Sequence, residues 1–238
     1  MKLQSILKWI VLVTLSTTFD ANAANIAVYG GYYATDITNW LNTTGNTASN
    51  RGDSAIIGTD LLNVDVVIVD RTISGNTALA DFIFAGGKLI TEWSSSQYGM
   101  SLLGGGASDN YNGYITNDAI NFSASGLALG LGQLIGTSYR DGERTEFFQD
   151  FDALGSGSVL ATRGSSGAPV IVGGSYGAGY IFANGFDWSD AFPRANSQTR
   201  RLLLNQIDPS QVPVPGAIWL FGSALAAVSR FGRVTRSR

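Results

Sequence analysis

The chain has 238 residues with a formal net charge of -3, and it contains neither cysteine nor histidine. The missing residue types exclude thiolate nucleophiles, disulfides, serine–histidine–aspartate triads and histidine-rich zinc sites. Lys2, Lys8 and the four arginines beyond residue 229 lie near the chain ends, so the middle is acidic. This charge distribution argues against a nucleic-acid partner, because contacts with phosphates need a basic face.

The amino-terminal segment has the layout of a secretory signal peptide. Two lysines accompany an apolar stretch from Trp9 to Leu15, and the small residues Ala21 and Ala23 follow it. The alternative is a membrane anchor or a buried helix, but the stretch is well short of the roughly 18 to 20 residues that a spanning helix needs. We predict a signal helix in residues 1–23, export through the Sec machinery, and cleavage by signal peptidase after Ala23.

Residues 24–208 are predicted to form one α/β domain. A β-branched run ending in glycines, residues 25–31, predicts the first strand. A helix follows, with Thr35 or Asp36 as its N-cap and Gly45 as its stop. A strand followed by a helix is the first unit of such a domain.

The strongest core prediction is the continuous apolar run NVDVVIVD, residues 63–70. Such a run is typical of a strand that is buried on both faces of a parallel sheet. A helix in residues 74–87, with two glycines as its stop, and a strand in residues 88–93 follow it. Two successive β-α-β crossovers favour an open, mostly parallel sheet flanked by helices.

The second half of the domain shows weaker periodicity. Residues 94–152 are predicted to form ligand-facing or variable loops. Short strands are predicted at residues 157–164, 168–174 and 179–188, and the turn GSYGAG joins the last two as a C-terminal β-hairpin. A final helix is predicted over residues 197–207.

Three stretches carry a family resemblance: VDVVIVD with the helix after it, AGGKLITEW, and APVIVGGSYGAGYIFANGFDW. They resemble the class I glutamine amidotransferase-like fold, in the branch that includes trehalose-utilisation-type domains. In that family the chain turns sharply after a central strand and presents a nucleophilic cysteine, which histidine and glutamate assist. The matching turn here would lie near Glu92, Trp93 and Ser94. Because cysteine and histidine are absent, the resemblance implies the fold and carries over no amidotransferase residue.

The first candidate site residues, Asp70, Glu92 and Ser94, follow two predicted strands. Sheets of this class bind ligands at the carboxyl ends of their strands, and two carboxylates there could serve as acid and base. In the structural alternative, Asp70 caps a helix or loop and Glu92 pairs with an arginine such as Arg71. We favour the structural alternative, because the sequence does not fix the separation of the carboxylates.

The second candidate site, a ligand-binding one, consists of Asp187, Trp188 and Asp190. An aromatic ring between carboxylates could stack on a sugar or help to bind calcium. The spacing lacks the twelve-residue ligand series of an EF-hand, however. The favoured alternative is a structural loop in which Trp188 packs on the core and the aspartates accept backbone hydrogen bonds. We expect no metal and no cofactor.

The carboxy-terminal segment, residues 209–238, joins a proline motif to a short apolar run and an arginine tail. It resembles the PEP-CTERM sorting signals in their VPLPA variant, and it departs from that variant at Val214 and Gly216. The apolar helix predicted over residues 216–229 is marginal for a full membrane span, and the arginines would hold its far end in the cytoplasm.

This resemblance implies a sorting pathway. An exosortase-type transpeptidase would recognise the motif Val212, Pro213, Val214 and Pro215. The protein would be anchored transiently in the inner membrane and would then pass to the cell envelope or the extracellular space.

Two functions from different classes follow from these patterns. The first is an exported, C-terminally sorted envelope or extracellular-matrix protein with a non-catalytic α/β binding domain. The second is a carboxylate-dependent hydrolase that acts on extracellular polysaccharide. The absence of histidine and cysteine favours the first, and polysaccharide is the expected extracellular partner.

Overall fold

The computed structural model describes residues 23–71, 73, 76–106, 113–115, 118–140, 145–147, 150–193 and 197–208. Ala21 and the sorting motif Val212 to Pro215 lie outside these ranges, so the signal helix, the apolar tail helix and the arginine tail stay predictions. Among the helices in the described ranges, none combines the length and apolarity that a membrane span requires.

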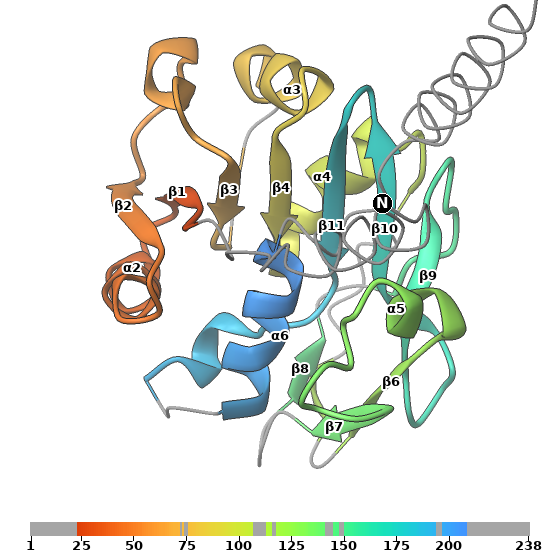
Figure 1. The fold of residues 1–238 in the computed structure, drawn as a ribbon. Coiled ribbons are helices and arrows are strands. Elements are labelled where there is room, and N and C mark those ends of the chain that lie inside the picture. Colours follow the sequence, from red (N-terminus) through yellow and green to blue (C-terminus); the bar gives the residue numbers. More distant parts are fainter. Residues whose placement is uncertain are drawn as a thin grey trace, which may run out of the picture.

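The centre of the fold is a nine-stranded sheet in the order β2-β1-β3-β4-β11-β10-β9-β6-β7 (Figure 1). Its strands are β1 (Asn25–Tyr29), β2 (Thr47–Gly52), β3 (Val66–Val69), β4 (Lys88–Thr91), β6 (Ala119–Phe122), β7 (Ser138–Arg140), β9 (Ser158–Arg163), β10 (Pro169–Tyr176) and β11 (Gly179–Asn184). A separate pair is formed by β5 (Gly113–Ile115) and β8 (Thr145–Phe147). The helices are α2 (Ala34–Asn42), α3 (Thr77–Phe84), α4 (Ser96–Leu102), α5 (Ala124–Ala128) and α6 (Ser197–Ile207), with 3-10 turns η1 (Gly58–Leu61), η2 (Trp93–Ser95) and η3 (Ser189–Ala191).

The sheet is mixed. Strands β2, β1, β3, β4 and β11 pair in parallel, whereas β11, β10, β9, β6 and β7 pair antiparallel. The short turns that connect β9, β10 and β11 leave no room for a crossover, so they can join only antiparallel neighbours. The predicted open α/β sheet with flanking helices and the predicted C-terminal hairpin, which is β10–β11, are confirmed.

Helices cover both faces of the sheet (Figure 1). On one face, α2 and α6 bury Ile37 and Leu203 against the strands, and on the other face α3 and α4 bury Leu79 and Met100. All four residues of β3 are buried, as the apolar run in residues 63–70 predicted. The parallel strands are thus held rigidly between two helical layers, and their carboxyl ends form one edge.

The first helix begins earlier than the sequence predicted. It starts at Ala34, with Tyr33 rather than Thr35 or Asp36 at the N-cap position. The cause is a distant side chain: the Tyr33 backbone N–H donates to Asp70 Oδ2 at 2.6 Å. The carboxylate of Asp70, which directly follows β3, therefore takes the place of a local capping side chain.

Two further parts of the chain differ from the prediction. Strand β2 was not predicted, because its sequence TASNRG is polar and lies at the edge of the sheet. Residues 94–152, predicted as loops, include α4, α5 and the strand β6, which lies inside the sheet between β9 and β7. The strand β6 has only four residues, too few for a clear period of two.

At the amino ends of the parallel strands, Lys88 forms hydrogen bonds with the end of α6. Its Nζ donates to the carbonyl oxygens of Gln206 and Ile207, both at 2.9 Å, and to that of Asp208 at 3.3 Å. These are carbonyls that a helix terminus leaves without partners. Burial lowers the pKa of Lys88 to about 8.

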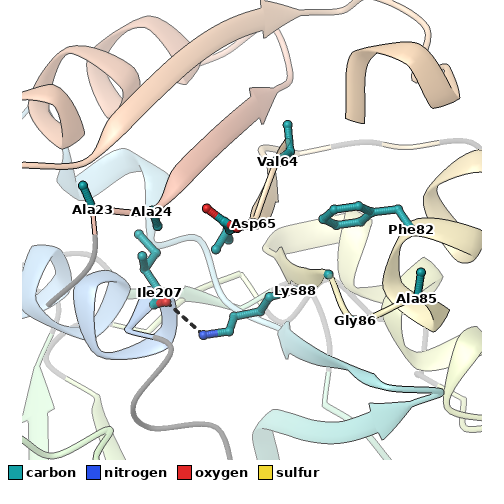
Figure 2. A pocket seen from close by; sticks show the side chains of 11 residues that line it. Ala23, Ala24, Val64, Asp65, Phe82, Ala85, Gly86, Lys88 and Ile207 are labelled. Carbon is teal, nitrogen blue, oxygen red and sulfur yellow. Dashed lines mark hydrogen bonds between the residues drawn. The ribbon is translucent and has the colours of Figure 1, made fainter. Parts of the chain in front are cut away.

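A cavity of about 670 Å³ adjoins this lysine and is lined by residues that include Ala23, Phe82 and Ile207. Figure 2 shows the Lys88 stem along the cavity and its amino group turned toward Ile207. Ala23, where the described chain begins, and Ile207, where α6 ends, therefore line the same cavity as Lys88.

Candidate functional site

Three carboxyl groups meet at the carboxyl ends of neighbouring parallel strands. Asp70 follows β3, Glu92 follows β4, and Asp187 comes shortly after β11. These strands are adjacent in the sheet, and each of the three residues is at most 1% exposed. The structure thus brings together two predicted catalytic candidates and one predicted ligand-binding candidate, and it buries all three.

Backbone donors hold the first two carboxyl groups. Tyr33 N–H donates to Asp70 Oδ2, and Arg71 N–H donates to Glu92 Oε1 at 2.7 Å. Asp70 therefore caps α2, and Glu92 binds Arg71, as in the structural alternative, although it binds the backbone and not the guanidinium. The other oxygens, Asp70 Oδ1 and Glu92 Oε2, are buried without a hydrogen-bond donor among the described residues.

A proton on Glu92 would supply the hydrogen-bond donor that these two buried oxygens lack. Burial raises the pKa of Glu92 well above its ordinary value of 4.5, and the negative charges of Asp187 and Asp70 raise it further. Arg71 acts in the opposite direction, while a side-chain hydrogen bond with Asp70 favours the protonated form. Protonated Glu92 can donate a hydrogen bond to Asp70.

The guanidinium of Arg71 closes over this acidic cluster. Its Nη2 lies 2.6 Å from Asp187 Oδ2 and 3.1 Å from Asp190 Oδ1. The guanidinium carbon lies 4.5 Å from the ring centroid of Tyr32 and 4.9 Å from that of Trp93. The Arg71 side chain is 21% exposed, whereas that of Asp187 is fully buried. Arg71 therefore separates the carboxylates from solvent.

The turn that the family resemblance placed near Glu92, Trp93 and Ser94 is present. Trp93 has a φ of 50° and Arg71 a φ of 75°, a left-handed conformation that costs a bulky residue about 1–3 kcal/mol. Ser94 Oγ donates to the Arg71 carbonyl at 2.5 Å, and Ser95 Oγ donates to the Val69 carbonyl at 3.0 Å. These bonds join the two strained loops. Tryptophan at this turn carries no nucleophilic atom, and Ser94 is engaged in holding the loop.

The second candidate site forms the structural loop of the favoured alternative. Trp188 is 2% exposed and packs against Phe192, with ring centroids 5.6 Å apart. Asp187 Oδ1 accepts from Ser189 Oγ at 3.1 Å and from Asp190 N–H at 3.2 Å. The Trp188 ring is therefore not available for stacking on a ligand. Within the described ranges, no group of three or more acidic, histidine or cysteine side chains could hold a metal ion.

Sequence reasoning missed two features of this edge. The first is the half-buried stack of Tyr32, Arg71 and Trp93, which depends on left-handed backbone that no local motif encodes. The second is a cavity of about 420 Å³ beside the ends of β1, β2 and β3, whose lining includes Tyr29 and Asp53. The polar run Arg51-Gly52-Asp53-Ser54 could have signalled it if β2 had been recognised as a strand.

Comparisons with known proteins support the fold. No family model and no curated protein matches the sequence. A glutamine amidotransferase from Thermotoga maritima has a TM-score of 0.57 at 10% identity, over 80% of this chain and 99% of that one. A ThuA-like protein from Bacteroides uniformis has a TM-score of 0.54 at 12% identity, over 82% and 97%. The chain is thus an α/β protein with a fold resembling that of amidotransferases.

The same fold occurs as a part of longer proteins. A β-galactosidase from Bacillus circulans sp. alkalophilus has a TM-score of 0.53 at 17% identity, over 84% of this chain. The match covers 33% of the β-galactosidase chain. At such identities the likeness concerns the fold alone.

Proposed function

We propose that this protein is an exported, C-terminally sorted component of the cell envelope or extracellular matrix, and that its α/β domain binds a ligand without catalysing a reaction. The segments in residues 1–23 and 209–238 are the basis for export and sorting. The transient partners would be the Sec machinery, signal peptidase, the inner membrane and an exosortase-type transpeptidase. The lasting partner would be an extracellular polysaccharide.

The observation that carries the non-catalytic assignment is the burial of Asp70, Glu92 and Asp187 under Arg71. A catalytic carboxyl group must come within hydrogen-bond distance of its substrate. Here the oxygens are held by backbone N–H groups, by a guanidinium and by a neighbouring carboxyl group. At the strand ends where sheets of this class bind ligands, these three carboxyl groups are therefore buried and serve to hold the structure.

The second candidate function is the carboxylate-dependent hydrolase. The raised pKa of Glu92 favours it, because a general acid must be protonated at the working pH. The arrangement opposes it, because glycosidase carboxyl groups stand roughly 5 to 10 Å apart with substrate or water between them. Glu92 and Asp70 instead share a hydrogen bond, which leaves no space for a glycosidic bond.

We expect the full-length chain in detergent micelles to bind one or more extracellular polysaccharides and to hydrolyse none. Retention on immobilised polysaccharides would be measured beside the release of reducing sugar. Glu92→Gln replaces the protonated carboxyl group with an amide of the same shape, so it should bind as the parent chain does. Hydrolysis that Glu92→Gln abolishes would establish the enzyme and refute the binding assignment.

We expect the mature protein in its native host to begin at Ala24 and to have lost the segment after the Val212–Pro215 motif. Mass spectrometry of the envelope and extracellular fractions measures both ends at once. Substitution of both motif prolines by alanine should leave the precursor in the inner membrane. An intact carboxyl terminus at Arg238 in the extracellular fraction would refute processing but not export.

A further inference from the structure

We propose that the chain cleaves itself at the peptide bond between Asp208 and Pro209, and that Lys88 catalyses this step by holding the reacting carbonyl group. Asp208 and Pro209 form the only aspartate–proline pair in the 238 residues. The pair directly follows α6, and the Asp208 carbonyl oxygen accepts a hydrogen bond from Lys88 Nζ at 3.3 Å. This activity is separate from the proposed ligand binding and from recognition of the motif Val212–Pro215.

The nucleophile in this reaction is the side chain of Asp208 itself. Its carboxylate oxygen attacks the carbonyl carbon of the same residue, and a cyclic anhydride forms as the bond to the proline nitrogen breaks. That nitrogen takes up a proton from the solvent and leaves as the amino terminus of residues 209–238. Water then opens the anhydride to a side-chain and a terminal carboxyl group, so the net reaction is hydrolysis of one peptide bond.

Lys88 places a positive charge at the carbonyl oxygen that becomes negative in this reaction. Its Nζ also donates to the carbonyl oxygens of Gln206 and Ile207, both at 2.9 Å, so the ammonium group is fixed at the end of α6 (Figure 2). Lys88 is 6% exposed, and a hydrogen bond to a charged group is stronger where water is excluded. The ammonium group can therefore stabilise the tetrahedral intermediate, as an oxyanion-hole donor does.

The lysine must be charged to act in this way. Burial lowers the pKa of Lys88 to about 8, while the negative charge of Asp208 acts in the opposite direction, so the ammonium form predominates at neutral and acidic pH. The other charged residues that line the adjoining cavities are Asp65, in the cavity of Lys88, and Arg201, in that of Asp208. Because the cleavage step consumes a proton, it should be faster at pH 5 than at pH 8.

Solvent reaches the residue at which the chain would be cleaved. Asp208 is partly exposed and lines a cavity of about 250 Å³, together with residues that include Gly45 and Asn205. Ile207 lines both this cavity and the neighbouring one of about 670 Å³ beside Lys88. The proton for the leaving nitrogen and the water that opens the anhydride can therefore come from the solvent.

The test compares the folded full-length chain in detergent micelles with a synthetic peptide of residues 204–214, which has the same bond but no lysine. Both are incubated at pH 5, and mass spectrometry measures the fragments that end at Asp208 or begin at Pro209. The folded chain should be cleaved at least about a hundredfold faster than the peptide, the usual contribution of one oxyanion donor. Added hydroxylamine should form a hydroxamate at residue 208, because it captures an anhydride but not a free acid.

Three variants assign the roles of the residues. Asp208→Asn removes the nucleophile and should abolish cleavage, whereas Asp65→Asn removes the same charge from the cavity of Lys88 and should leave the rate unchanged. Lys88→Met should slow cleavage by about a hundredfold. Because Lys88→Met also removes hydrogen bonds to the end of α6, the parent chain unfolded in urea provides a second measurement. It should be cleaved at the rate of the peptide.

Equal cleavage rates for the folded chain and the peptide would refute this inference. Cleavage that persists in Asp208→Asn, or that keeps its full rate in a folded Lys88→Met chain, would refute it as well. None of these outcomes bears on the proposed function, because cleavage at the motif Val212–Pro215 leaves a longer mature chain than cleavage after Asp208. Cleavage after Asp208 without any processing at that motif would refute the sorting proposal alone.

Discussion

Replacement of Arg71 by methionine should destabilise the folded protein by about 3 to 5 kcal/mol, the usual cost of removing one partner of a buried ion pair. Asp187 is fully buried, and Arg71 Nη2 lies 2.6 Å from its Oδ2. Methionine can still pack between Tyr32 and Trp93, so the loss would report mainly on charge. Urea unfolding followed by circular dichroism at neutral pH measures it.

The control for this prediction is the double variant Arg71→Met with Asp187→Asn, which removes both charges and should recover much of the lost stability. A loss below about 1 kcal/mol, the usual value of an exposed ion pair, would mean that Arg71 does not neutralise a buried charge.

Glu92→Gln should change how the stability of the fold depends on pH. The pKa of Glu92 is raised in the folded protein, so its protonation contributes stability that is fully present below the unfolded value of about 4.5. That contribution is lost as the pH rises from there through the folded pKa, with a slope of up to about 1.4 kcal/mol per pH unit. Glutamine does not titrate and can donate permanently to Asp70.

The measurement is the difference in free energy of unfolding between Glu92→Gln and the parent chain from pH 4 to pH 8. This difference should shift steadily in favour of the variant as the pH rises, because the unfolded parent chain releases a proton from Glu92 that the folded parent chain retains, whereas glutamine does not titrate. Asp81→Asn, on the exposed surface of α3, should show no such trend. A difference that is constant over this range would show that Glu92 is ionised in the fold.

The sequence was sufficient to predict the two central strands and the residues that follow them. The apolar runs before Asp70 and before Glu92 are typical of buried parallel strands, so the two acids were predicted to reach the same edge of the sheet. Asp187 could not be placed with them from sequence. Its position depends on β11 pairing with β4, across about 90 residues of chain, and no local pattern encodes a pairing at that distance.

The chemistry of the candidate site was less predictable than its location. The sequence suggests Arg71 as a partner for Glu92, but the contact of Arg71 with Asp187 and its stacking between Tyr32 and Trp93 depend on left-handed backbone at two non-glycine residues. Propensity disfavours that conformation for both residue types. For Trp188 the sequence allows both roles, because no local pattern distinguishes a tryptophan that faces a ligand from one that packs on a neighbour such as Phe192.

The bonds from Lys88 to the last carbonyls of α6 also determine how a tethered domain would be oriented. They fix the exit of the chain beside Ala23, at the amino ends of the parallel strands. The aromatic stack of Tyr32, Arg71 and Trp93 lies at the carboxyl ends of those strands. In the proposed anchored form, a domain held at either end would have this edge on the side away from the membrane. The same bonds join the end of α6 directly to the central strand β4.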